Sequence, residues 1–126
     1  MAGHEDDVVV GEGYAVANID SLGEGYGFRK IRRALGVTAF GINEIRLPPG
    51  AQGREHDEAD LDEEEVYVGL AGSGTFTVDG APVAFGAGQY LRVDPGSTRL
   101  IEAGPDGLRF LAIGAPSGSR RGRPTL

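Results

Sequence analysis

Short apolar runs, separated at regular intervals by turn residues, constrain the fold of this chain more than any other feature. The sequence contains 22 glycines and 7 prolines, and they are spread between these runs, which favours many tight turns. Asp79-Gly80 predicts a type I′ hairpin turn, because both central positions of that turn need a positive φ. Roughly nine short strands with this spacing predict an all-β sandwich or barrel.

The expected strands follow the apolar alternation along the chain. They cover residues 14–18, 28–33, 37–47, 65–71, 74–78, 83–85, 89–93, 98–102 and 108–113. Residues 31–35 are an alternative candidate for one helical turn. Turns are expected at Gly72-Ser73 and over residues 104–107, where small residues interrupt the apolar pattern.

The chain length of 126 residues fits a single domain. We expect one barrel domain over residues 11–114, a flexible tail over residues 1–10 and a flexible basic tail over residues 115–126. No apolar stretch is long enough to span a bilayer, so no membrane partner is expected. The chain has no cysteine, which excludes disulfides and thiolate metal sites and makes the cytoplasm the expected location.

Negative charge is concentrated in residues 54–65, which we call the acidic segment. The whole chain has 12 basic and 19 acidic residues, a net charge of −7. The acidic segment holds eight acidic residues against Arg54, which is also a net −7, so the rest of the chain is neutral. A field that attracts nucleic acid is therefore not expected. Most of these acids are expected to belong to a solvated loop.

From Pro48 to Ile113 the chain resembles a small single-domain cupin. The first cupin motif reads G, five residues, H-x-H, three or four residues, E, six residues, G, and a second motif reads G-x5-P-x-G-x2-H in its usual looser forms. The matching residues are Gly50, Glu65 and Gly72 for the first motif, and Gly88, Val93, Pro95 and Gly96 for the second. The resemblance implies an all-β fold, the cupin double-stranded β-helix or jelly-roll barrel.

Cupin metal sites use two histidines and the glutamate of the first motif, with the histidine of the second. Here His56 stands nine positions before Glu65, and the H-x-H pair would fall around residues 58–61. Arg99 occupies the expected place of the second-motif histidine, and a guanidinium cannot bind a metal. The resemblance therefore implies a barrel without the standard metal centre and no expected cofactor. The alternative is a divalent metal (Mn, Fe, Ni or Zn) bound by His56, Glu65 and neighbouring carboxylates.

The resemblance also places Glu65 and Tyr67 on the inner face of one strand, with Arg99 on the facing strand. One interpretation is a pocket in which Arg99 holds a carboxylate, phosphate or carbonyl while Glu65 accepts a proton or hydrogen bond. The other is that Arg99 simply pairs with Glu65. We expect a cavity that binds a small polar or anionic molecule through Arg99, Glu65, Tyr67 and His56.

Two further functions remain open from the sequence. The first is an enzyme: a metal-dependent oxygenase or isomerase with an atypical site at His56 and carboxylates, or a metal-free isomerase with Glu65 as its base. The second is a structural dimeric interaction module with a filled cavity.

The basic stretch Phe28–Arg33 is typical of an edge strand protected by cationic side chains. Small cupins commonly dimerise through strands near the N-terminus, so the resemblance implies a homodimer. We expect Phe28–Arg33 to lie near the partner's acidic segment.

Overall fold

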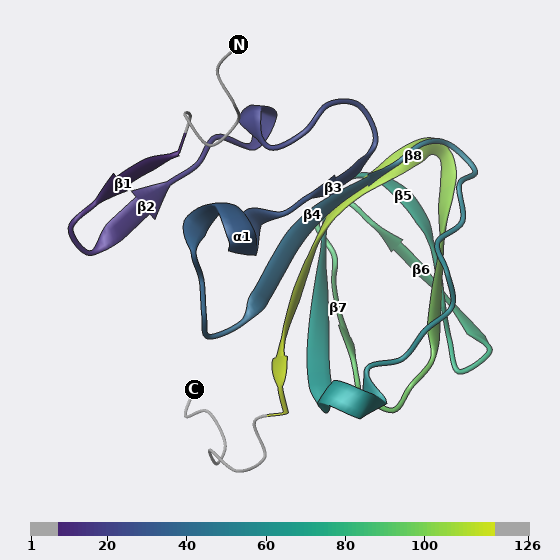
Figure 1. Ribbon diagram of the computed structural model, residues 1–126. Helices are drawn as coiled ribbons and strands as arrows, with labels where there is room; N and C mark the ends of the chain where they lie inside the picture. The colour runs from purple at the N-terminus through teal and green to yellow at the C-terminus, as the bar shows by residue number, and fades with distance from the viewer. Residues whose placement is uncertain (1–7, 118–126) are drawn as a thin grey trace.

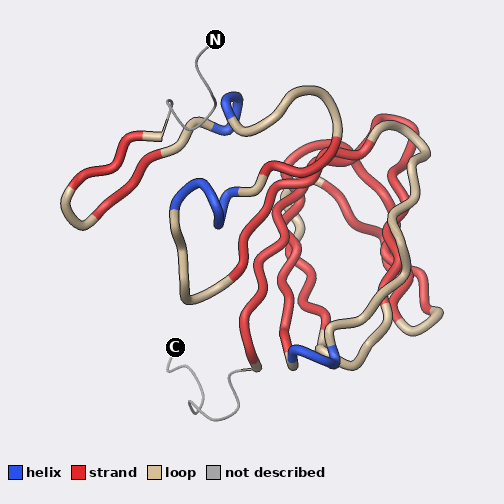
Figure 2. Tube along the Cα trace, in the orientation of Figure 1, coloured by secondary structure: helices blue, strands red, loops and turns tan. Residues whose placement is uncertain are grey.

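A computed structural model describes residues 8–117, most of which form an antiparallel barrel (Figure 1; Figure 2). Hydrogen bonds connect the strands of one six-stranded sheet in the order β3-β4-β8-β5-β6, and β7 pairs with β5. The all-β barrel predicted from the turn spacing is confirmed. The strands of the barrel are β3 (Gly27–Arg29), β4 (Gly41–Leu47), β5 (Glu63–Val78), β6 (Ala81–Gly86), β7 (Tyr90–Val93) and β8 (Arg99–Pro116).

β5 and β8 are long strands that pair with each other along almost their whole length. Four strands were predicted here, so the turns expected at Gly72-Ser73 and over residues 104–107 are wrong. Both intervals lie inside continuous strands, and the pairing register shifts between Gly69 and Ala71 and again between Gly72 and Gly74. Such irregularities bend a strand without ending it.

Glycines permit the bend where backbones approach closely. A Cβ at Gly69 would overlap the carbonyl of Gly86, and one at Gly72 would overlap the carbonyl of Gly107. Gly72 also has a φ of 76°, which disfavours other residues. The small residues that suggested turns in the sequence are therefore needed for strand packing.

The Asp79-Gly80 turn is confirmed. It joins β5 to β6, and φ is 49° at Asp79 and 82° at Gly80, both positive as a type I′ turn requires. The Asp79 carboxylate also accepts a hydrogen bond from the Thr98 backbone N–H at 2.9 Å. This contact fastens the hairpin to the segment that leads into β8.

The N-terminal part of the chain lies outside the barrel sheet. β1 (Val9–Gly11) and β2 (Tyr14–Val16) form a separate two-stranded sheet that projects from the barrel, which we call the N-terminal hairpin (Figure 1). It is followed by the 3-10 helix η2 (Ile19–Ser21), β3 and the short helix α1 (Ile31–Leu35). None of the described helices is long and apolar enough to cross a membrane.

Several predicted boundaries need correction here. The strand expected over 28–33 ends at Arg29, and the alternative helical turn over 31–35 is present as α1. The strand expected from residue 37 begins at Gly41. The domain expected over 11–114 includes residues 11–26, which lie outside the barrel sheet. In the expected N-terminal tail, residues 9 and 10 belong to β1, and in the expected C-terminal tail, residues 115 and 116 belong to β8. The parts of these tails over residues 1–7 and 118–126 lie outside the described residues.

Aromatic side chains from three strands, β5, β6 and β8, fill the core. The ring centroids of Tyr67 and Phe76 are 4.6 Å apart, and those of Phe76 and Phe85 are 5.1 Å apart in an edge-to-face arrangement. Phe110 contacts the same group, and Phe76 is only 1% exposed. Edge-to-face pairs add to the stabilisation from burial.

Replacing Phe76 with alanine should therefore destabilise the fold strongly. We expect a loss of about 3–5 kcal/mol in the free energy of unfolding, because the substitution leaves a cavity among buried aromatic rings. Urea denaturation followed by circular dichroism measures it. Tyr26→Ala is the matched control, since Tyr26 is 64% exposed and its loss should cost less than about 0.5 kcal/mol. Equal losses in the two variants would show that the aromatic cluster is not the core.

Candidate functional site

A cavity of about 620 Å³ lies within the barrel, and most of its wall is apolar. Ile45, Phe76 and Phe110 are among the apolar side chains that line it, and Phe28 also borders it. The polar lining residues that were predicted to bind a ligand are all present: His56, Glu65, Tyr67 and Arg99. Glu58, Arg54 and Asn43 line the cavity as well. A ligand would therefore meet an apolar wall and a group of charged side chains.

Glu65 and Tyr67 reach the cavity from the beginning of β5, where strand alternation places both on the inner face. The Tyr67 hydroxyl donates a hydrogen bond to Glu65 Oε1. Burial and this contact with a carboxylate raise the pKa of Tyr67 well above its ordinary value. Tyr67 is therefore a neutral hydrogen-bond donor at physiological pH.

Arg99 enters the cavity from the first residue of β8 and is 1% exposed. Its Nη2 donates to Glu65 Oε1 at 3.2 Å, and its Nη1 donates to the Ser97 carbonyl oxygen at 2.9 Å. Arg99 Nε has no hydrogen-bond partner among the residues that the structure describes. Arg99 thus pairs with Glu65, as the second interpretation of the sequence expected, and it also lines the cavity, so the pairing leaves the ligand-binding interpretation open.

His56 lies beside the same cavity although the sequence spacing placed it too far from Glu65. Backbone hydrogen bonds join His56 and Arg99 in both directions, at 3.0 and 2.8 Å. The 3-10 helix η3 (Ala59–Leu61) takes up the additional residues between His56 and Glu65, and its side chains are exposed. The sequence spacing placed the H-x-H pair of the first motif around residues 58–61. This placement is wrong for residues 59–61, because their side chains face solvent and not the cavity. His56-Asp57-Glu58 lies at the cavity instead.

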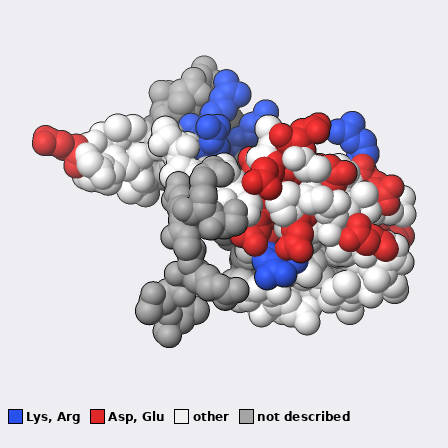
Figure 3. Space-filling model, turned by 90° about the horizontal axis from the view of Figure 1, so that it is seen from below, with Lys and Arg blue, Asp and Glu red and all other residues white. Residues whose placement is uncertain are grey.

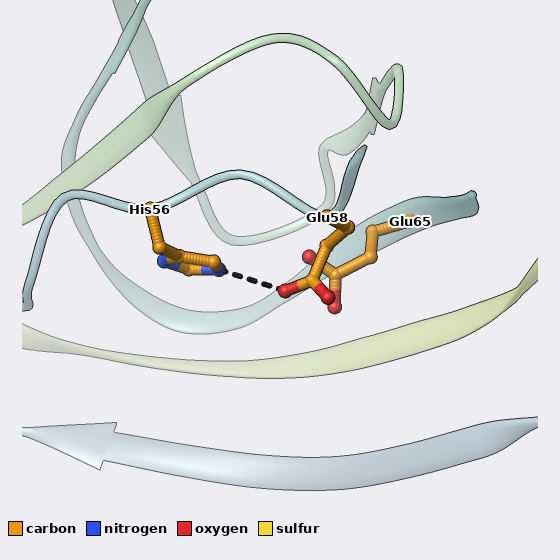
Figure 4. A group of neighbouring side chains, drawn as sticks. All are labelled: His56, Glu58 and Glu65. Carbon is orange, nitrogen blue, oxygen red and sulfur yellow. Dashed lines mark ion pairs between the residues drawn. The ribbon is translucent and has the colours of Figure 1, made fainter. Parts of the chain in front are cut away.

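His56, Glu58 and Glu65 point toward one another (Figure 4), and one potential ligand atom from each lies within 4.8 Å of the others. His56 Nε2 is 3.2 Å from Glu58 Oε2. His56 Nδ1 is 3.1 Å from the Arg54 carbonyl oxygen, which can only accept, so Nδ1 carries the proton in that contact. Nε2 is then the nitrogen that faces the two carboxylates.

Glu58 is the functional candidate that the sequence missed. It is one of eight acids in residues 54–65, and the motif spacing placed it only among the four positions 58–61, with nothing to separate it from its exposed neighbours. Burial raises the pKa of Glu58, and the nearby negative charge of Glu65 raises it further, while His56 and Arg99 oppose this. Two carboxylates are thus held close together at a partly desolvated place, where a cation would relieve their repulsion.

The three side chains fit a divalent metal ion by their chemistry. One imidazole nitrogen and two carboxylates are suitable ligands for first-row transition metals. A ring whose Nδ1 donates to a carbonyl oxygen while Nε2 faces the ion is the arrangement found around metal-binding histidines. Arg99 is the opposing feature, because it adds a positive charge that cannot serve as a ligand.

This chain is similar to known proteins in both sequence and structure. The family model for the Cupin domain matches residues 43–114, more than half of the chain. A cupin protein from Bacteroides fragilis superposes with a TM-score of 0.75 at 28% identity, covering 89% of this chain and 92% of that one. A predicted oxalate decarboxylase from Thermotoga maritima gives a TM-score of 0.56 at 31% identity, over 61% of this chain and 66% of that one.

One curated enzyme also matches by sequence. Dimethylsulfoniopropionate lyase DddW from Ruegeria pomeroyi is 40% identical over 85 residues, which is 68% of this chain and 49% of that protein. The chain thus spans about half the length of this relative.

The raised pKa of Glu58 predicts a direct effect on stability. A raised pKa means that the folded state binds this proton more tightly than the unfolded chain, so ionisation of Glu58 destabilises the fold as the pH rises above 4.5. In the presence of EDTA, Glu58→Gln should therefore raise the melting temperature at pH 7 more than at pH 4. Scanning calorimetry measures both. Asp60→Asn, at an exposed position of η3, is the control and should show no such difference. A lower melting temperature for Glu58→Gln at pH 7 would mean that its contact with His56 outweighs the repulsion.

Proposed function

Because this chain belongs to the Cupin domain family, we propose that its barrel binds a small molecule with an anionic or polar acceptor group, for which Arg99 is the anchor. The observation that carries the proposal is the state of the Arg99 guanidinium. It borders the cavity, it is 1% exposed, and its Nε has no partner among the described residues. Cupin folds support many activities, so the proposal depends on this site and not on the fold.

A buried guanidinium with unused N–H groups favours an oxygen-bearing ligand. Arginine has five N–H donors, and an unsatisfied buried donor costs free energy that a ligand acceptor recovers. The bond to Glu65 involves one carboxylate oxygen at 3.2 Å, which is longer than usual for a charge-assisted pair. Because Nε is buried, a ligand carboxylate or carbonyl oxygen would reach Arg99 at Nη1 or Nη2, each of which carries two N–H groups and makes one hydrogen bond.

The other polar residues would orient the same ligand. Glu65 neutralises the charge of Arg99, and the neutral Tyr67 hydroxyl holds the Glu65 carboxylate in place. His56 is more exposed, with 42% of its side chain accessible, so it would meet the ligand at the entrance. A volume of about 620 Å³ with an apolar wall suits a small metabolite that has an apolar part beside its polar group.

Calorimetric titration with small carboxylates tests the role of Arg99. The probes are oxalate and dimethylsulfoniopropionate, chosen after the substrates named for the two relatives, together with propionate. We expect Arg99→Gln combined with Glu65→Gln to weaken binding at least about tenfold, because the charge-assisted hydrogen bonds are lost while no unpaired charge remains. Arg92→Gln is the matched control, since Arg92 is an exposed arginine on β7.

Two results would contradict the proposal. One is a double variant that binds as tightly as the parent protein. The other is a failure of every carboxylate probe to bind the parent protein.

A metal-dependent lyase or isomerase is the second candidate function. Two observations favour it: the grouping of His56, Glu58 and Glu65, and the similarity to dimethylsulfoniopropionate lyase DddW over part of its length. A divalent ion held by these three side chains would act as a Lewis acid toward a substrate oxygen.

The chain's own residues would supply the rest of such a reaction. For dimethylsulfoniopropionate, elimination removes a proton from the carbon next to the carboxylate and breaks a carbon–sulfur bond, giving acrylate and dimethyl sulfide. Glu65 would accept the proton on the carboxylate oxygen that does not hold the ion, and Arg99 would hold the substrate carboxylate. Tyr67 would keep the Glu65 carboxylate oriented through their hydrogen bond.

Metal analysis of protein purified without chelator distinguishes this candidate from the first. The metal-dependent candidate predicts close to one equivalent of Mn, Fe, Ni or Zn, lost in Glu58→Gln and in Glu65→Gln, with dimethyl sulfide release measured by gas chromatography falling in parallel. Glu55→Gln is the control, because Glu55 is an exposed acid of the same segment. Carboxylate binding by metal-free protein, with no dimethyl sulfide released after metal addition, would leave only the binding function.

A further inference from the structure

Arg54 is a charged residue of the cavity lining that has no part in the proposed function. It is the only lysine or arginine in the acidic segment, where it stands with eight acids. None of the ion pairs among residues 8–117 nevertheless involves Arg54. Figure 3 shows Asp and Glu side chains gathered over the end of the barrel where η3 lies in Figure 1. The charge of Arg54 is thus left unpaired on a surface that is rich in carboxylates.

The other charged side chains of the cavity lining pair with one another. Arg99 Nη2 lies 3.2 Å from Glu65 Oε1, and His56 Nε2 lies 3.2 Å from Glu58 Oε2. Arg54 lines the same cavity and is exposed, so it lies at the entrance. Among the described residues, the lining therefore has one guanidinium in its buried wall, which shares a carboxylate, and one at its entrance, which has none.

Backbone hydrogen bonds hold Arg54 beside the beginning of β8. His56 exchanges two hydrogen bonds with Arg99. The Gly53 N–H donates to the Ile101 carbonyl oxygen at 2.8 Å. Three steps along this segment thus face two steps along β8, so the segment carries one extra residue, as a β-bulge does. Bulges re-aim side chains, and Gly53 and Arg54 both line the cavity.

The position of Arg54 relative to Arg99 constrains the shape of the ligand. Arg54 stands two residues before His56, the bridge partner of Arg99, and diagonal residues on paired strands have Cα atoms about 7–8 Å apart. Two long side chains therefore reach one cavity from neighbouring backbone positions. Their like charges repel, so an anionic group at each guanidinium would stabilise both. Apolar residues such as Phe76 and Ile101 line the same cavity, and they suit an apolar chain between the two groups.

We propose that Arg54 is a second anchor of the ligand, and that the cavity takes a dicarboxylate whose two carboxylates are joined by an apolar chain. Arg99 holds one carboxylate inside the barrel, and Arg54 holds the other at the entrance. This substrate class rests on the proposed carboxylate binding and narrows it, because Arg99 alone would accept a monocarboxylate. The acids of the surrounding surface strengthen the selection, since they repel a carboxylate that no guanidinium faces.

Calorimetric titration with ligands that differ by one charge tests the second anchor. Glutarate and its monoamide have the same chain, and the amide replaces one carboxylate with a neutral group of similar shape. On protein dialysed free of metal, glutarate should bind at least about fivefold more tightly than the monoamide. The factor is modest because water screens an ion pair at an entrance. Succinate and its monoamide give the same comparison with a shorter chain.

Arg54→Gln should remove this preference. The variant lacks the charge, so its affinity for glutarate should fall about fivefold, while its affinity for the monoamide stays within about twofold of the parent value. Arg54→Lys retains the charge and should retain most of the preference. Arg92→Gln is the matched control, because it removes the same charge from an exposed arginine outside the cavity lining and should leave the preference intact. Circular dichroism shows whether each variant keeps the fold.

The possible outcomes separate the second anchor from carboxylate binding itself. Equal affinity of the parent protein for each dicarboxylate and its monoamide would overturn the second anchor and leave binding at Arg99 intact. The same conclusion would follow if Arg54→Gln kept the preference, or if it weakened both ligands alike. If none of the four ligands binds the parent protein, the second anchor and the proposed function fail together.

Discussion

The barrel depends on the way the paired strands β5 and β8 bend back on themselves. Glu65 lies at one end of this ribbon, opposite Gly114, and Arg99 lies at the other end, opposite Val78. In a flat ribbon the 13 steps from Glu65 to Val78 would separate these ends by about 40 Å. Their side chains instead meet at 3.2 Å inside the barrel. The bend at the glycines of β5 therefore creates the cavity and the charge pair together.

Neighbouring charges decide how the partly buried carboxylates behave in this small fold. Burial raises the pKa of Glu44, but hydrogen bonds and charges from Arg109 and Arg46 outweigh it and leave that pKa below its ordinary value. Glu58 has the opposite outcome: burial raises its pKa, the nearby charge of Glu65 raises it further, and the opposing effects of His56 and Arg99 are smaller. The ionised carboxylate of Glu44 stabilises the sheet because two arginines pair with it. The ionised carboxylate of Glu58 is repelled by Glu65, and a bound cation or a proton would relieve that repulsion.

The sequence predicted what depends on local chemistry. The Asp79-Gly80 turn and the inward face of Glu65 and Tyr67 followed from backbone preference and strand alternation. The two long strands were not predicted, because a glycine that permits close packing inside a bent strand looks the same as a glycine that ends one. His56 was placed too far from Glu65 because spacing counts residues along the chain, and η3 removes three of them from the path. The pKa of Glu58 is raised because the fold partly buries it and places it near Glu65, and neither effect is visible in the sequence.

The four tyrosines of the chain are distributed unequally between solvent and cavity, and the chain contains no tryptophan. Tyr14, Tyr26 and Tyr90 are 60%, 64% and 75% exposed, whereas Tyr67 is 4% exposed and bonded to a carboxylate. A molecule inside the barrel would contact the inner ring and leave the three outer rings in water. Tyr67 is thus an intrinsic chromophore at the candidate site, and its ultraviolet absorption would report what enters the barrel without any label.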